Sequence, residues 1–135
     1  MKNNLVSTYD SVKEKVESLD DNVIFSLSVD EYCFAVGQLT KYLVSQSAAK
    51  NKTFELADSI LSAKTKEKID REIQKLIKKY SHALSMKNRK LNNLISMVMG
   101  VSFEENDTLN KDMIMAGFVS NNIIYQKNDK KDMEE

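Results

Sequence analysis

Residues 28–43 have the sequence SVDEYCFAVGQLTKYL, which predicts one helix together with its start signal. Ser28 and Glu31 match a capping box, in which each side chain accepts a hydrogen bond from the backbone N–H of the other residue. Apolar side chains then recur at helical spacing on one stripe, formed by Tyr32, Val36, Leu39 and Leu43. Gly37 lies in the middle of this helix, where glycine costs about 1 kcal/mol relative to alanine. We therefore expect a close approach to a second helix at Gly37.

The sequence on either side of this segment is also helical in pattern. Apolar residues recur at steps of three and four over residues 5–19, 53–61, 65–80, about 85–99 and about 110–125. The chain of 135 residues has no proline and only three glycines, whereas a β-rich domain would need more turn-forming residues. We therefore expect an all-α fold, a compact bundle of about five helices. It is predicted to be a single domain over residues 1–126, followed by a disordered acidic tail over residues 127–135.

Few side chains in the sequence are suited to catalysis or to metal binding. Cys33 is the only cysteine and His82 the only histidine, which excludes an internal disulfide and the usual zinc sites. Cys33 is expected to be a small buried side chain, and His82, with no nucleophile or carboxylate motif beside it, to have a structural role. There is no glycine-rich phosphate loop. We expect no enzymatic activity, no cofactor and no metal.

The sequence contains no predicted targeting or membrane-spanning segment. Polar residues interrupt the apolar run that a signal peptide would need near the start of the chain. No stretch approaches the roughly 20 apolar residues that span a bilayer. We expect a soluble protein of the cytoplasm that makes no contact with a membrane.

Methionines and tyrosines are expected to pack in the core rather than to bind a ligand. Five methionines are predicted to fill gaps between helices, namely Met86, Met97, Met99, Met113 and Met115. Two roles are possible for the three tyrosines near the apolar stripes, which are Tyr32, Tyr42 and Tyr80. They can pack in the core with the hydroxyl at its rim, which we expect, or stack on nucleic-acid bases.

Charge is distributed unevenly along a chain whose net charge is zero. Residues 1–40 contain 3 basic and 7 acidic side chains, residues 41–90 contain 13 and 5, and residues 91–135 contain 4 and 8. The middle third therefore has a charge of +8 between two segments of −4 each. A zero sum of this kind does not exclude a polyanion-binding surface.

The basic residues of the middle third follow helical spacing. Six basic residues are predicted to lie opposite the apolar stripe of the helix over 65–80, namely Lys64, Lys68, Arg71, Lys75, Lys78 and Lys79. Five more are predicted to extend this positive zone, namely Lys50, Lys52, Lys87, Arg89 and Lys90. From Lys68 to Lys79 the stripe is about 16 Å long at 1.5 Å per residue. Phosphates of one DNA strand recur at about 3.4 Å along the axis, so the stripe can follow several of them. The alternative is a solvated face with weak local pairs to Glu67, Asp70 and Glu72.

Several short segments carry a resemblance to a known family. They are residues 31–39 (EYCFAVGQL), 42–43 (YL), 50–53 (KNKT), 79–84 (KYSHAL), 116–120 (AGFVS) and 123–125 (IIY). In order and spacing they resemble the C-terminal helical part of the large subunit of type I-B CRISPR Cascade, which that family also produces as a separate small subunit. The resemblance covers about residues 28–125 and includes no catalytic motif.

The resemblance implies a non-catalytic subunit of a CRISPR interference complex. Such small subunits occur in more than one copy, and they contact the backbone subunits. They help to hold the guide RNA–target DNA heteroduplex and the displaced DNA strand. This role needs cations directed at phosphates, because pairing with the guide RNA reads the sequence. The expected partners are the Cascade backbone and large subunits, further copies of the chain, and these nucleic acids.

Two other hypotheses remain open at the level of sequence. One is a helical protein–protein interaction module whose basic face docks an acidic partner. The other is a helix-turn-helix regulator, which the sequence favours less because no short glycine-containing turn separates two helices with base-reading side chains.

Overall fold

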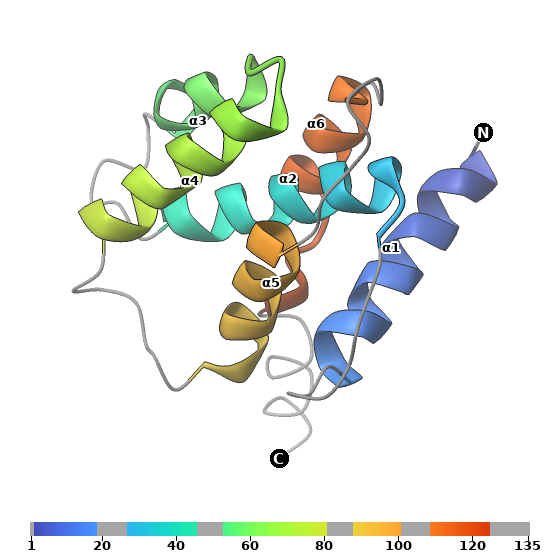
Figure 1. Cartoon of the computed structure of the whole chain (residues 1–135). Helices are drawn as coiled ribbons and strands as arrows, with labels where there is room; N and C mark the ends of the chain where they lie inside the picture. Colours follow the sequence, from blue (N-terminus) through green and yellow to red (C-terminus); the bar gives the residue numbers. More distant parts are fainter. Residues whose placement is uncertain (1, 19–26, 46–52, 81–87, 101–108, 125–135) are drawn as a thin grey trace.

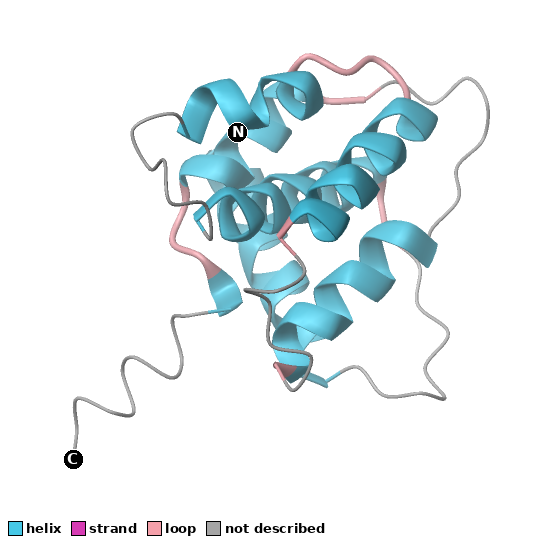
Figure 2. Ribbon diagram, turned by 90° about the vertical axis from the view of Figure 1, so that its left-hand side faces the viewer, coloured by secondary structure: helices cyan, strands magenta, loops and turns pink. Residues whose placement is uncertain are grey.

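The protein is described by a computed structural model that places residues 2–18, 27–45, 53–80, 88–100 and 109–124. Six helices occupy these residues, namely α1 (Lys2–Ser18), α2 (Val29–Ser45), α3 (Thr53–Leu61), α4 (Lys66–Lys79), α5 (Arg89–Gly100) and α6 (Lys111–Val119). No strand occurs in these ranges (Figures 1 and 2). The predicted all-α fold is confirmed, with six described helices in place of about five. The predicted tail over residues 127–135, together with His82 and Met86, lies outside the described residues.

Helix α2 forms the centre of the bundle. The predicted capping box is present at its start, where the Glu31 N–H donates to Ser28 Oγ at 3.0 Å and the Ser28 N–H donates to Glu31 Oε1 at 2.9 Å. Every residue from 32 to 40 is buried, so the helix is covered on all sides. The other helices are arranged around it (Figure 1). Cys33 is buried as predicted, and burial raises the pKa of its thiol to about 11.

The closest crossing in the fold joins α2 to α6 through two glycines. A Cβ atom added at Gly37 would lie 2.1 Å from the carbonyl oxygen of Ile114 and 2.6 Å from the amide nitrogen of Phe118. A Cβ atom added at Gly117 would lie 2.2 Å from the carbonyl oxygen of Phe34. Only hydrogen fits at both positions, which confirms the close helix–helix approach expected at Gly37.

Helix α6 is shorter than the predicted helix over about 110–125. Asn110 caps its start by accepting a hydrogen bond from the Met113 N–H at Oδ1, and Ser120 ends it in an extended conformation. The buried amide of Gln38 then binds the backbone beyond the helix. Its Nε2 donates to the carbonyl oxygens of Gly117 (2.8 Å) and Asn121 (3.1 Å), and its Oε1 accepts from the Ile123 N–H (2.7 Å). The backbone leaves the helix at residues 120–122 and is helical again at Ile123 and Ile124.

Helix α1 shares the core with α2 and α5. The rings of Tyr9 and Phe34 meet edge to face with centroids 5.5 Å apart. Lys15 Nζ lies 3.1 Å from Glu31 Oε1, and Asn93 Nδ2 donates to the Val16 carbonyl oxygen at 2.7 Å. Residues from the first, second and fifth helices therefore form one packed unit.

Two expectations about α5 and the methionines need correction. The predicted start near Ser85 is wrong, because Asn88 Oδ1 accepts a hydrogen bond from the Leu91 N–H and the helix begins at Arg89. Met97 is buried, and Met99 and Met113 pack against the core as predicted. Met115 is 40% exposed, because Ile114, Gly117 and Phe118 form the buried side of α6.

Candidate nucleic-acid interface

Helix α4 holds the candidate surface in place through its apolar side. Thr65 caps the helix by accepting a hydrogen bond from the Lys68 N–H at Oγ1, with a length of 3.1 Å. Ile69, Ile73 and Leu76 are buried, so the opposite side of the helix must face solvent. The last turn contains Lys78 and Lys79, and positive charge at this end stabilises a helix by interacting with its dipole.

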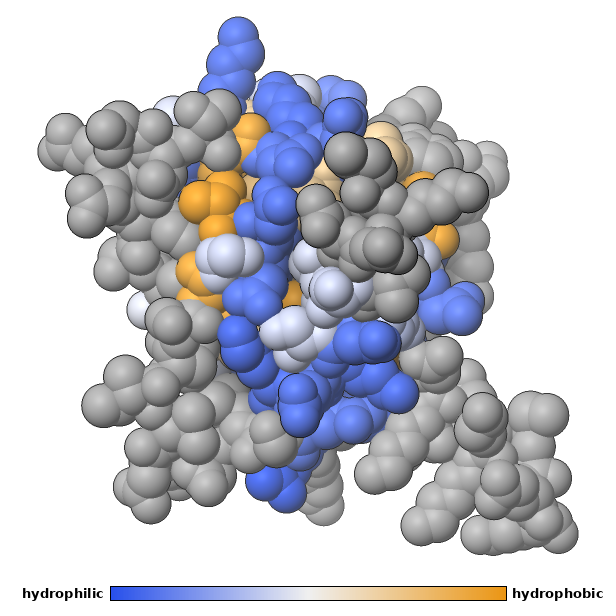
Figure 3. Space-filling view, turned by 90° about the vertical axis from the view of Figure 1, so that its right-hand side faces the viewer, coloured by the Kyte–Doolittle hydropathy of each residue, from blue (hydrophilic) through white to orange (hydrophobic). Residues whose placement is uncertain are grey.

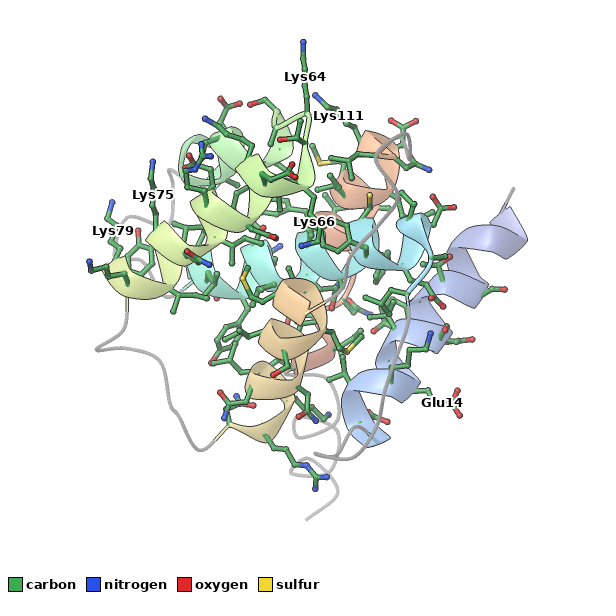
Figure 4. The ribbon with its side chains drawn as sticks, in the orientation of Figure 1. Glu14, Lys64, Lys66, Lys75, Lys79 and Lys111 are labelled. Atoms are coloured by element: carbon green, nitrogen blue, oxygen red, sulfur yellow. The ribbon has the colours of Figure 1, made fainter. Side chains whose placement is uncertain are left out.

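Six basic side chains are exposed along α4 and the turn before it. They are Lys64, Lys68, Arg71, Lys75, Lys78 and Lys79, which we call the α4 cationic surface. In Figure 4, Lys64, Lys75 and Lys79 point away from the body of the molecule. The helical spacing noted in the sequence thus corresponds to one outward-facing surface.

Glu72 lies within the α4 cationic surface and pairs with two of its lysines. Its Oε2 lies 3.3 Å from Lys75 Nζ and 3.7 Å from Lys68 Nζ, and its Oε1 accepts a hydrogen bond from Ser59 Oγ of α3 at 3.1 Å. Desolvation raises the pKa of Glu72. The hydrogen bonds from Ser59 and Lys75 and the charges of Lys75 and Lys68 lower it by more, so its pKa lies below the ordinary value. Glu72 is therefore ionised at neutral pH.

The other cations of this surface are not neutralised in this way. Lys64, Arg71 and Lys78 form no ion pair with any acidic side chain in the described ranges. Lys79 Nζ lies 5.6 Å from the centroid of the Tyr80 ring, a cation–π contact that leaves its charge intact. Among the described residues, these four side chains therefore carry most of the uncompensated positive charge of the surface.

Lys66 and Asp70 lie on the inner side of α4 and attach it to α2. Lys66 Nζ pairs with Asp70 Oδ2 at 2.5 Å and lies 5.5 Å from the centroid of the Tyr32 ring. The Tyr32 hydroxyl donates to Asp70 Oδ1 at 3.3 Å, and burial with the Asp70 charge raises its pKa. Because Tyr32 and Tyr42 are buried, base stacking is excluded for both and their predicted core packing is confirmed.

Of the cations predicted outside α4, Arg89 and Lys90 lie in the described residues, and neither joins the α4 cationic surface. Lys50, Lys52 and Lys87 lie outside the described residues. Arg89 is exposed, but it begins α5, whose first turn lies at a different edge of the molecule from α4 (Figure 1). The expectation for Lys90 is wrong, because its side chain is only 14% exposed and its Nζ lies 3.5 Å from Glu17 Oε2 of α1.

One exposed cation near this surface was missed by the sequence analysis. Lys111 begins α6, and its Nζ donates to the carbonyl oxygen of Ser62, in the turn between α3 and α4, at 3.1 Å. Lys64 and Lys111 project from the same edge in Figure 4. No local signal identifies Lys111, because it belongs to the third of the chain that is acidic overall. It reaches the turn at Ser62 only through the packing of α6 beside α3.

Acidic side chains are exposed on the opposite side of the molecule. Asp10, Glu14 and Glu17 are exposed on α1. Glu14 projects on the side away from Lys75 and Lys79 in Figure 4, and hydrophilic residues dominate the described atoms of that side in Figure 3. Lys2, Lys13 and Lys15 balance these three acids, so α1 has no net charge, whereas α4 contains six basic and three acidic side chains.

The described residues hold neither a metal-binding cluster nor a helix able to span a membrane. No group of three or more His, Cys, Asp or Glu side chains there is placed to hold a metal ion. None of the helices in the described ranges combines the length and apolar character that a membrane span requires. Comparison with protein-family models, with curated protein sequences and with solved structures gave no match.

Proposed function

We propose that this chain is a non-catalytic, nucleic-acid-binding small subunit of a type I-B CRISPR interference complex in the cytoplasm. In this proposal the α4 cationic surface binds the phosphates of the guide RNA–target DNA heteroduplex and of the displaced DNA strand. The observation that carries the proposal is the row of six exposed cations on one side of α4, of which Lys64, Arg71 and Lys78 have no acidic partner among the described residues.

The form of this surface favours phosphate over base recognition. Side chains on a single outward helical face can follow a backbone of regularly spaced charges, whereas base readout requires an element that enters a groove. The helix is fixed from behind by its buried isoleucines and by the Tyr32–Asp70–Lys66 cluster. Binding should therefore be independent of sequence and should weaken as salt increases.

The resemblance described above supports the assembly part of the proposal. Backbone and large subunits and further copies of the chain are the protein partners that it implies. The protein would add positive charge to an assembly in which guide pairing provides specificity.

Binding to labelled DNA across a salt series tests the nucleic-acid part of the proposal. We expect weak binding to single-stranded DNA and to duplexes of unrelated sequence, with log K falling linearly with log salt. Lys78→Glu should weaken binding at low salt, since it reverses one charge on the α4 cationic surface. Lys13→Glu on α1 makes the same charge change away from α4 and is the matched control. Equal effects of the two variants would contradict a localised interface.

Assembly is tested with a triple variant that reverses Lys75, Lys78 and Lys79 to Glu. The wild-type chain should copurify with a guide RNA filament of backbone subunits and increase DNA capture by the complex. The triple variant should join the filament but capture less DNA. If it instead fails to join while the wild-type chain binds no DNA, the surface docks an acidic protein partner and the nucleic-acid proposal is wrong.

A further inference from the structure

The six cations of the α4 cationic surface differ in their neighbours: Lys68 and Lys75 pair with Glu72, whereas the other four, Lys79 included, pair with no described acidic side chain. Arg71 and Lys78 are seven residues apart, about 10.5 Å along the helix axis at 1.5 Å per residue. That is close to three phosphate steps of about 3.4 Å along one strand. Lys64 precedes Arg71 by the same seven residues in the adjoining turn. None of the three pairs with a described acidic side chain.

Lys68 and Lys75 share the carboxylate of Glu72. Both Nζ atoms approach the same oxygen, Oε2, at 3.7 and 3.3 Å. The Glu72 side chain is only 12% exposed, whereas those of Lys68 and Lys75 are 48% and 66% exposed. Ser59 of α3 holds the other carboxylate oxygen at 3.1 Å, so the carboxylate is fixed from a neighbouring helix. Two accessible lysines thus surround one ordered anion.

We infer that Glu72 is an internal competitor of phosphate that restrains the affinity of this surface for polyanions. It partly neutralises Lys68 and Lys75, so that the principal phosphate contacts are made by the four other cations, Lys64, Arg71, Lys78 and Lys79. This inference rests on the proposed nucleic-acid function and assigns roles within it. A phosphate approaching either paired lysine also approaches the fixed negative charge of Glu72, which reduces the gain from the contact.

The magnitude of this competition follows from the exposure of the pairs. Ion pairs between exposed side chains contribute at most about 1 kcal/mol, which corresponds to about a fivefold change in affinity. Glu72→Gln removes the charge but keeps an oxygen that can accept from Ser59, so the fold should be unchanged. We expect Glu72→Gln to tighten binding to DNA about fivefold at low salt and to steepen the salt slope by about one.

The test compares four variants of the full chain on a fluorescently labelled duplex of about 20 base pairs, followed by anisotropy across a salt series. The salt slope is the slope of log K against log salt, to which each phosphate contact contributes about 0.9. Arg71→Gln combined with Lys78→Gln removes two such contacts and should reduce the slope by about two. Lys68→Gln with Lys75→Gln should reduce it by less than one. Glu67→Gln is the matched control for Glu72→Gln, because Glu67 is exposed on the same helix and forms no described ion pair. It should leave the slope unchanged.

The possible results separate this inference from the function on which it rests. If the wild-type chain binds DNA but Glu72→Gln behaves as Glu67→Gln does, Glu72 is not a competitor and the proposed function stands. The same conclusion follows if the Arg71/Lys78 and Lys68/Lys75 double variants reduce the salt slope equally. If neither the wild-type chain nor Glu72→Gln binds DNA at low salt, the proposed function fails and the inference fails with it. Circular dichroism of each variant verifies that the helical fold is retained.

Discussion

The close crossing of α2 and α6 predicts that replacing Gly37 with alanine lowers the free energy of unfolding. Helix propensity alone predicts the opposite, because alanine favours a helix more than glycine does. Gly37→Ala places a methyl group in a space where its carbon would lie 2.1 Å from the carbonyl oxygen of Ile114. An ordinary contact begins near 3.4 Å, so the two backbones must separate by about 1.3 Å, the difference between these values. The obstructing atoms are backbone atoms in a helix, which no change of rotamer can move.

The cost can be worked out from the contacts that span this crossing. Overpacking of a well-packed core costs about 1–3 kcal/mol. Separating the helices also stretches the hydrogen bonds of Gln38 to the backbone of α6 and beyond, and one buried group left unsatisfied adds about 1–3 kcal/mol. Against these stands the propensity gain of alanine over glycine, about 1 kcal/mol. We expect the free energy of unfolding to fall by about 3 kcal/mol.

Urea unfolding followed by circular dichroism measures this change directly. With a slope of about 1–3 kcal/mol per molar urea, the midpoint should fall by at least about 1 M. Met115→Ala, on the exposed side of the same α6 helix, is the control and should change stability by no more than about 0.5 kcal/mol. A Gly37→Ala variant as stable as the wild-type protein, or more stable, would refute the steric reasoning.

Three further predictions concern the buried polar contacts and the core. Gln38→Leu should lower the free energy of unfolding by about 2–4 kcal/mol in urea, because it leaves two carbonyl oxygens and one N–H without their partner. Burial raises the pKa of Glu31, but hydrogen bonds from Ser11, the Ser28 amide and Lys15, with the Lys15 charge, lower it by more. The ionised Glu31 side chain therefore stabilises the fold above pH 4.5, and this stabilisation is lost as the pH falls through the lowered pKa of the folded state. In acid titrations of the free energy of unfolding, Glu31→Gln should show a smaller loss of stability below pH 4.5 than the wild-type protein. Ile73→Ala should cost about 2–5 kcal/mol by opening a cavity under α4, and a loss below 1 kcal/mol would show that the site collapses.

Much of the candidate surface could be predicted from the sequence, because α4 is regular and its spacing is local. Thr65, the buried stripe and the outward cations all follow from the geometry of one helix. The pairing of Lys68 and Lys75 with Glu72 was anticipated only as weak local pairing. The contact from Ser59 that fixes Glu72 joins two helices, and neither segment alone indicates it.

The sequence by itself determined the helical class, the capping box of Ser28 and Glu31 and the close approach at Gly37. Each of these depends on interactions within a few residues, or on the steric demand of one residue, so local rules suffice. Only the tertiary structure decided where α6 ends, that Lys90 faces Glu17, and that Lys111 binds the Ser62 carbonyl oxygen in the turn before α4. These results depend on contacts between residues far apart in the chain, such as the binding of the backbone at Ile123 by Gln38. Periodicity along a single helix does not contain them.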